Sequence, residues 1–417
     1  MAVFAGVAGR RWRVTAPGQE EATREPIRSR LVIMLPGFEP VSLGAHRRRF
    51  RNAAATTAAT FGLQVSVGAL MPQQPDGPVD IASWTMTTLG PGWRTEAEIV
   101  FYDSAAMNAH YAARSAPRRI ASGIGAILAM IGTGAFARYV RDGWRFALFC
   151  LMPIGVVAFV ATLAAAVPVL AAWLLGSLHL VWSVPLAALG AWAGLRYADR
   201  KLHLLLACDL WTATRDLARH QGPWPRFLAA VCDDIGRRID ATEADEVVVV
   251  GHSLGAAPAV MALADERALA AAAKRPVGFL GAGSYLLAVA HHPAARSLRD
   301  CVRAVIGGRA TWLEAQSLTD PVNFYRSNPA RALDAGPPER VSILRVRFRN
   351  QLTPEHYNRI KRDFFRIHRQ FVMGVERRTP YALHAIIGGP RPLPDIAAGG
   401  GLREREPEAS RSLATGS

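Results

Sequence analysis

Residues 246–255 have the sequence Glu-Val-Val-Val-Val-Gly-His-Ser-Leu-Gly, and a helix-forming stretch from Ala256 to Leu269 follows them. The valine run predicts a buried strand, so the segment has the order strand, G-x-S-x-G turn and helix. Glycine at positions 251 and 255 lets the strand and the helix approach each other, which leaves Ser253 on a sharp turn. The pattern favours a nucleophilic serine with a helix N-terminus behind it, where developing negative charge is stabilised. A glycine-rich strand end is the plainer alternative in a chain with 36 glycines.

Further strands and helices are predicted on both sides of this segment. Apolar or alternating runs indicate strands at residues 31–35, 81–88, 96–102, 276–280, 310–315 and 341–348, and helical patterns cover residues 45–61 and 212–239. Strands that alternate with helices are typical of a mostly parallel sheet with helices on both faces. The predicted fold class is therefore α/β.

A run without Asp, Glu, Lys or Arg extends from Phe146 to Leu195 and interrupts the α/β pattern. Since one membrane-crossing helix needs about 20 apolar residues, the run predicts two transmembrane helices, at Phe146–Val167 and Val169–Ala191. A buried helical hairpin, or a hairpin that dips into one leaflet, is the alternative. The stretch Ile120–Phe136 is also apolar, but small and hydroxyl residues interrupt it, which is more typical of an interfacial segment.

Basic residues flank both ends of the charge-free run, at positions 138, 141, 145, 196, 200 and 201. Basic residues are enriched on the cytoplasmic side of membrane proteins, so both ends are expected there. We expect an integral protein of a bacterial-type cytoplasmic membrane, with its main domain in the cytoplasm. The chain divides into an N-terminal basic segment (1–30), the first part of the α/β domain (31–119), a membrane-associated segment (120–201), the second part of the α/β domain (202–387) and a disordered tail (388–417).

The composition agrees with a membrane-associated protein. Half of the 417 residues are hydrophobic, and 49 Lys and Arg against 33 Asp and Glu give a net charge of +16. This excess suits an anionic membrane surface, and the chain has no recognisable nucleic-acid-binding module, so nucleic acid is not an expected partner. The four cysteines are scattered and form no C-x-x-C pair, which predicts no disulfide framework and no metal site. No cofactor is expected.

A serine nucleophile needs an orienting acid, and Asp320 is the first candidate. It follows an apolar strand start and precedes Pro321, which disfavours helical geometry at the aspartate and keeps it in a loop. A carboxylate just beyond a strand end suits the order nucleophile, acid, histidine along the chain. An ordinary Asp-Pro turn is the alternative, and Glu314, within the strand, is the second candidate acid.

Four histidines are considered as the base: His252, and His356, His368 and the later His384, which follow the strand predicted at 341–348. His356 lies in the first turn of a helix that Thr353 and Pro354 begin, and His368 lies about three turns later among phenylalanines, where an imidazole is partly buried. A histidine among aromatic residues is also common in a core. His252, next to Ser253, is expected to point away from it, because neighbouring side chains alternate in direction.

These motifs together resemble the α/β-hydrolase superfamily, and especially its class 3-like lipases. In those lipases the elbow is often G-H-S-L-G, as at residues 251–255, and the acid often lies in an Asp-Pro-Val, as at 320–322. Their histidine precedes an aromatic residue by three positions, as His368 does, so the resemblance places His368 above His356. The chain departs from the pattern at Pro36-Gly37, where many relatives have His-Gly.

The resemblance implies an α/β-hydrolase-like fold and a catalytic triad of Ser253, Asp320 and His368. The backbone N–H groups of Phe38 and Leu254 would form the oxyanion hole. The expected activity is the hydrolysis of acyl esters, with a lipid or another apolar ester as the substrate. Two alternatives stay open: an acyltransferase that uses the same serine, and a catalytically inactive membrane protein that binds a partner.

Overall fold

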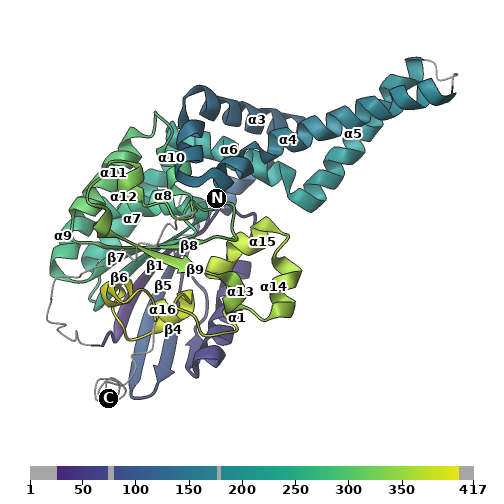
Figure 1. Ribbon diagram of the computed structural model, residues 1–417. Helices are drawn as coiled ribbons and strands as arrows, with labels where there is room; N and C mark the ends of the chain where they lie inside the picture. Colours follow the sequence, from purple (N-terminus) through teal and green to yellow (C-terminus); the bar gives the residue numbers. More distant parts are fainter. Residues whose placement is uncertain (1–25, 74–78, 176–179, 403–417) are drawn as a thin grey trace, which may run out of the picture.

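A nine-stranded sheet lies at the centre of the protein, whose computed structural model describes residues 26–73, 79–175 and 180–402 (Figure 1). The strands are β1 (Ser29–Leu35), β2 (Gln64–Val67), β3 (Met71–Gln73), β4 (Ile81–Gly90), β5 (Trp93–Tyr102), β6 (Glu246–His252), β7 (Val277–Ala282), β8 (Thr311–Ser317) and β9 (Val341–Val346). Their order is β2-β4-β5-β1-β6-β7-β8-β9, and β3 pairs with β4. The pairs from β5 to β9 are parallel, and β2, β3 and β4 form antiparallel pairs at one edge.

Helices cover both faces of this sheet. One face packs on α2 (Ala105–Ala112), α3 (Ala116–Gly132), α6 (Leu204–Ala218), α7 (Trp224–Ala241), α8 (Ala256–Leu263), α9 (Glu266–Lys274), α10 (Leu286–Ala290), α11 (Arg296–Gly307) and α12 (Pro329–Ala332). The other packs on α1 (Leu43–Phe61), α13 (Phe348–Gln351), α14 (Pro354–Ile360), α15 (Phe364–Arg369), α16 (Leu383–Gly388) and α17 (Leu393–Ala398). Alternate residues of β1 enter the two cores, Ile33 on one side and Val32 on the other, which explains its continuous apolar sequence. The α/β class predicted from the sequence is confirmed.

Two of the predicted helices are each divided in the structure. The region 212–239 contains the end of α6 and most of α7, and Gly222, whose φ of +62° leaves the helical region, lies between them. The stretch after the serine turn is divided into α8 and α9 at Asp265, whose side chain accepts a hydrogen bond from the Arg267 N–H and begins the second helix. Both divisions follow from local signals, a left-handed glycine and an N-cap aspartate.

The charge-free run forms parts of two helices that pack against each other and project from the body, α4 (Ala135–Leu175) and α5 (Leu180–Leu202). The bounds of the two membrane spans stay a prediction, but the two helices do not meet at the predicted junction near Val167-Pro168. Helix α4 continues through Pro168, where a break was expected, and one side of its first part, including Phe146 and Cys150, is buried in the core of the body. Charge-free sequence alone does not separate a core helix from a membrane helix, since both are apolar.

Among the described residues, only the stretch Ala135–Leu170 is a helix long and apolar enough to cross a membrane. The second crossing, predicted at Val169–Ala191, stays a prediction. The expected interfacial segment Ile120–Phe136 largely coincides with α3, which crosses α6 so closely that a Cβ on Gly123 would lie 2.6 Å from Cys208 Cα. One side of α3 is thus buried, while Leu128 and Ile131 on it are exposed.

The chain after residue 388, predicted as a disordered tail, is folded as far as residue 402. Leu393 and Ile396 of α17 are buried. The buried Arg30 donates hydrogen bonds to the carbonyl oxygens of Ile387 (2.6 Å) and Gly389 (2.9 Å) and pairs with Glu246 at 2.6 Å. This buried cation holds the segment against the sheet, a long-range contact that its glycine- and proline-rich composition does not reveal. Residues 403–417, and residues 1–25 of the predicted basic segment, lie outside the described residues.

Candidate active site

Ser253 lies at the carboxyl end of β6, on a turn that only small neighbours permit. Its φ is +53°, in the left-handed region that a serine rarely adopts. A Cβ on Gly251 would lie 2.5 Å from Ala256 Cα, and one on Gly255 would overlap the carbonyl oxygens of Leu35 and Pro36. The glycines therefore let strand, turn and helix approach, and the strained serine conformation is held by the packing around it.

The predicted acid and base are in direct contact. His368 Nδ1 lies 2.7 Å from Asp320 Oδ2, and both side chains are buried. The Val322 N–H and the side chain of Asn323 also donate to the carboxylate, at 2.9 and 3.0 Å. Because a carboxylate only accepts, Nδ1 of a neutral His368 carries the proton and Nε2 carries the free lone pair. This tautomer is the one a general base needs.

The free nitrogen of His368 is on the side of the ring away from the acid. Nε2 is buried, and none of the described side chains or backbone groups hydrogen-bonds to it. The turn after β7, residues 283–285, connects this ring to Ser253. The Tyr285 N–H donates a hydrogen bond to the Ser253 carbonyl oxygen, and a Cβ on Gly283, whose φ is +59°, would lie 3.3 Å from His368 Cε1. A hydrogen bond between Ser253 Oγ and Nε2 is not formed in this structure. Such bonds often tighten only in the substrate complex.

His252 occupies the space on the other side of His368. The two imidazole rings stack at 5.0 Å between centroids, and His252 Nε2 lies 3.4 Å from the His368 carbonyl oxygen. Burial lowers the pKa of His252 to about 3, with the nearby His368 acting in the same direction. His252 is therefore neutral, and a weak base, as expected for a neighbour of the serine that is not its general base.

The second candidate base is separate from this cluster. His356 Nδ1 pairs with Glu376 Oε1 at 2.6 Å, and the side chain is 34% exposed. The structure thus brings Ser253, Asp320 and His368 to one end of the parallel strands and does not bring His356 to Asp320.

The second candidate acid, Glu314, lies within β8 and is fully buried. Its carboxyl accepts a hydrogen bond from Trp312 Nε1 at 3.0 Å. Burial raises the pKa of Glu314 to about 8, although the indole bond acts in the opposite direction. A carboxyl that stays protonated at neutral pH does not orient an imidazolium, so Glu314 is poorly suited to the role of acid.

The raised pKa of Glu314 predicts a pH-dependent stability. Between about pH 4.5 and 8 the unfolded chain loses this proton while the folded protein keeps it, so stability falls as pH rises through that window. Glu314→Gln should remove the effect. We expect the difference in free energy of unfolding, wild type minus variant, to fall by about 1.4 kcal/mol per pH unit, measured by urea unfolding at pH 5, 6 and 7. A difference that does not change with pH would show that Glu314 ionises normally.

The two candidate oxyanion donors, Phe38 and Leu254, both lie close to the serine. A Cβ on Gly37, the residue before Phe38, would lie 2.8 Å from Ser253 Cβ, so the loop after β1 covers the serine directly. Phe38 and Leu254 both line a small pocket whose other walls include Met107. The walls of this pocket are largely apolar.

The base of α4 packs on the loop that holds the acid, residues 318–324. Phe146 and Phe324 lie 4.2 Å apart between ring centroids, and Arg145 Nη1 donates to the Leu318 carbonyl oxygen at 2.6 Å. A Cβ on Gly143, where α4 is kinked, would lie 2.9 Å from Phe324. The projecting helices are thus joined to the candidate site by direct packing.

Several residues around the site were not identified from the sequence. Asn323 and Tyr285 act through contacts described above, and Glu39, Arg369 and Asn108 surround the loop over the serine. For Glu39 one signal was available in the sequence: it is a charged residue that directly follows the apolar strand and Pro36-Gly37-Phe38.

Within the described ranges, no group of three or more His, Cys, Asp or Glu side chains is placed to hold a metal ion. No family model, curated protein or solved structure matches the chain.

Proposed function

We propose that this protein is a membrane-attached serine hydrolase of the α/β-hydrolase type that cleaves lipid or other apolar acyl esters. The observation that carries the proposal is the buried His368–Asp320 pair beside a serine with positive φ at a strand-to-helix turn. Nucleophile, acid and base (Ser253, Asp320 and His368) follow each other along the chain in the order that this fold uses. A parallel sheet with the three residues at one end supports the same proposal.

The proposed reaction transfers the acyl group to water in two steps. Ser253 Oγ attacks the ester carbonyl carbon while its proton passes to His368 Nε2, and Asp320 stabilises the imidazolium that forms. The N–H groups of Phe38 and Leu254 stabilise the oxyanion. As the ester C–O bond breaks, the imidazolium returns the proton to the leaving alkoxide. Water then attacks the acyl-serine by the same route, which releases the acid and restores Ser253.

The experiment that tests this function measures turnover by the full-length protein in detergent or nanodiscs. We expect p-nitrophenyl esters from acetyl to dodecanoyl to be hydrolysed, in the presence and absence of an added alcohol. Release of free acid as the main product supports a hydrolase. Quantitative transfer of the acyl group to the alcohol would instead indicate an acyltransferase, and the absence of any turnover would contradict both enzymatic functions.

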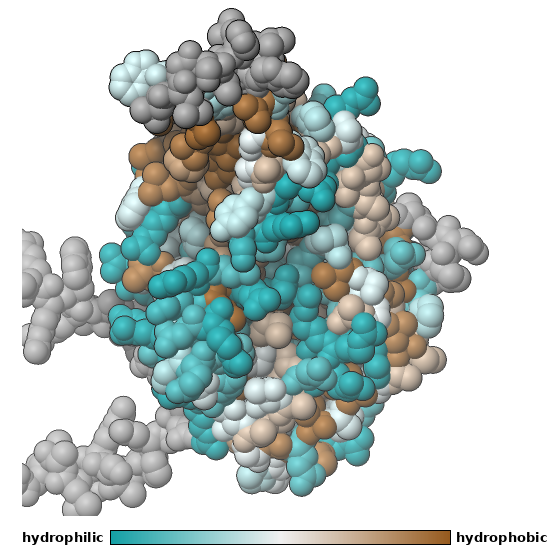
Figure 2. All heavy atoms as spheres, turned by 90° about the vertical axis from the view of Figure 1, so that its right-hand side faces the viewer, coloured by the Kyte–Doolittle hydropathy of each residue, from teal (hydrophilic) through white to brown (hydrophobic). Residues whose placement is uncertain are grey.

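Membrane attachment is proposed from the helices that project from the body. Figure 2 shows apolar side chains gathered around the projecting end, above a mostly hydrophilic face. Exposed apolar residues on α4 and α5 include Phe159, Leu163, Leu189 and Trp192, and the guanidinium of Arg196 lies 5.7 Å from the Trp192 ring centroid. An aromatic and a basic residue together are typical of a membrane interface. We propose that both helices enter the membrane and that the catalytic body faces the cytoplasm.

Removing the projecting pair should release the protein from the membrane. Residues 158–196 can be replaced by a short Gly-Ser linker, because Val160 and Gly194 are in contact and the cut ends are therefore close. We expect the shortened protein to move from the carbonate-resistant membrane fraction to the soluble fraction, because the exposed apolar surface is gone. Retention of the shortened protein in the membrane pellet would show that other surfaces mediate the attachment.

A further inference from the structure

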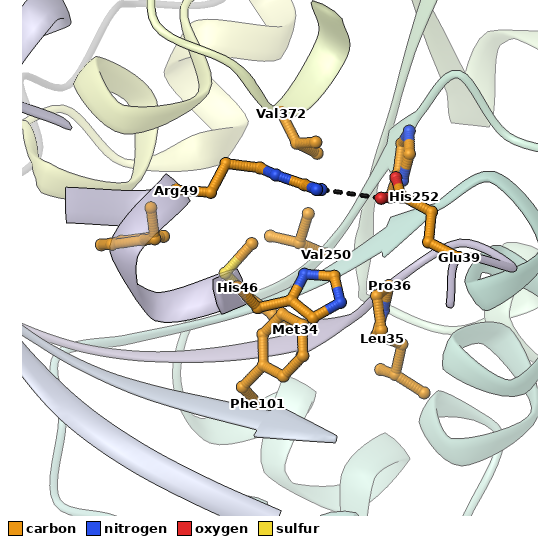
Figure 3. Close-up of a pocket in the computed structure, with 11 residues that line it drawn as sticks. Met34, Leu35, Pro36, Glu39, His46, Arg49, Phe101, Val250, His252 and Val372 are labelled. Carbon is orange, nitrogen blue, oxygen red and sulfur yellow. Dashed lines mark hydrogen bonds and ion pairs between the residues drawn. The ribbon is translucent and has the colours of Figure 1, made fainter. Parts of the chain in front are cut away.

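Glu39, the residue after the candidate oxyanion donor Phe38, has a buried carboxylate bound by two arginines from different parts of the chain. Arg49 Nη1, from α1, lies 2.8 Å from Oε2, and Arg369 Nε lies 3.3 Å from Oε1. Glu39 is 8% exposed. Figure 3 shows Arg49 reaching over a small pocket toward Glu39, whose carboxylate is next to His252. A buried carboxylate is costly unless it is paired in this way.

The backbone of the same loop is held from its other side. Asn108 Nδ2 donates to the Glu39 carbonyl oxygen at 2.6 Å, and Ser104 Oγ donates to the Gly37 carbonyl oxygen at 3.1 Å. Residues 36–39, which we call the oxyanion loop, are therefore fixed at their carbonyl groups by the start of α2. The carboxylate of Glu39 is then the contact that connects this loop to the segment carrying the base, since Arg369 directly follows His368.

The side chains between the two segments form a continuous stack. A Cβ on Gly37 would lie 3.0 Å from His252 Nδ1, and the His252 ring stacks on that of His368. A shift of Arg369 relative to the oxyanion loop would thus alter the position of the His368 ring. The charges of Arg369 and Arg49 outweigh the effect of burial and hold the pKa of Glu39 at about 2, so the carboxylate is ionised at neutral pH. Two histidines also face this pocket: burial lowers the pKa of His46 to about 4, and His252 is neutral as described above.

We propose that Glu39 is a positioning residue, whose bond to Arg369 keeps the oxyanion loop and the general base His368 in register. The proposal rests on the proposed hydrolase function. Phe38 N–H and His368 Nε2 must act on the same tetrahedral intermediate, one on its oxyanion and one on the proton of Ser253. A misplacement of about 1 Å between such groups can lower the rate about 100-fold. Loss of the contact that connects them is therefore expected to lower the rate of the chemical step more than the affinity for substrate.

The test compares phosphonylation by a fluorophosphonate, and ester turnover, per folded molecule of full-length protein. We expect kcat and the phosphonylation rate constant to fall roughly 10- to 100-fold in Glu39→Gln and in Arg369→Gln. KM should change by less than about threefold. Arg369→Lys, which keeps the cation, should recover most of the rate. The double variant should be no slower than the slower single variant, since both substitutions remove the same Glu39–Arg369 contact.

Arg366→Gln is the matched control. Arg366 is also on α15 and pairs with an acid, Asp363, but it is 62% exposed and does not contact the oxyanion loop, so its variant should react as the wild type does. Wild-type rates for Glu39→Gln and Arg369→Gln would overturn the inference while leaving the hydrolase function intact. The inference would also be overturned if these variants yielded less folded protein but the folded fraction reacted at the wild-type rate. If the wild type itself does not react, the hydrolase function fails, and the inference fails with it.

Discussion

Replacing Ser253 with alanine is expected to lower ester hydrolysis by about 10⁶-fold. The alanine lacks the oxygen that forms the acyl-enzyme, and the oxyanion donors alone provide only a small residual acceleration. The fold should be retained, because the turn depends on Gly251 and Gly255 and not on the hydroxyl. The measurement is the initial rate of p-nitrophenyl ester hydrolysis by the purified protein, relative to the uncatalysed rate.

Ser284 provides the control for this substitution. It follows Gly283 in the turn after β7, and its hydroxyl oxygen accepts a hydrogen bond from Leu286 N–H at 3.2 Å. Ser284→Ala should retain activity within about threefold, the change expected when a single modest hydrogen bond is lost. An active Ser253→Ala protein would exclude Ser253 as the nucleophile.

Replacing His368 with alanine should have an effect of similar size, about 10⁶-fold. His368 is the one candidate base bonded to a buried acid, so its loss leaves Ser253 without a proton acceptor. His356→Ala should stay within about threefold, because its partner is Glu376. The rates of both variants are measured with the same ester, and the Ser253→Ala, His368→Ala double variant should be no slower than either single variant. The reverse result, an inactive His356→Ala and an active His368→Ala, would show that His356 and not His368 is the base.

The local parts of the site could be predicted from the sequence because their chemistry depends on neighbours. The valines of β6 and the glycines at 251 and 255 define a strand and a tight turn within ten residues. The pairing of Asp320 with His368 spans 48 residues. It was expected through the resemblance, since the residues alone left His356 as an alternative.

Contacts between distant segments could not be predicted from local patterns. Glu39 and Arg369 are 330 residues apart, and neither lies in a motif that indicates the other. Arg30 likewise binds carbonyl oxygens near residue 387, which is why a glycine- and proline-rich stretch is folded where a disordered tail was expected. In α4 the sequence shows an apolar helix, but only packing distinguishes the buried Phe146 from the exposed Phe159.

The most direct test of the central proposal is to locate the phosphonate adduct after the native, full-length protein reacts with a fluorophosphonate. Peptide mass spectrometry should find the adduct on Ser253, and protein that is denatured first should carry none, because the reaction needs His368 and the oxyanion donors in place. An unmodified Ser253 in native protein, or an adduct on a different serine, would contradict the proposed function.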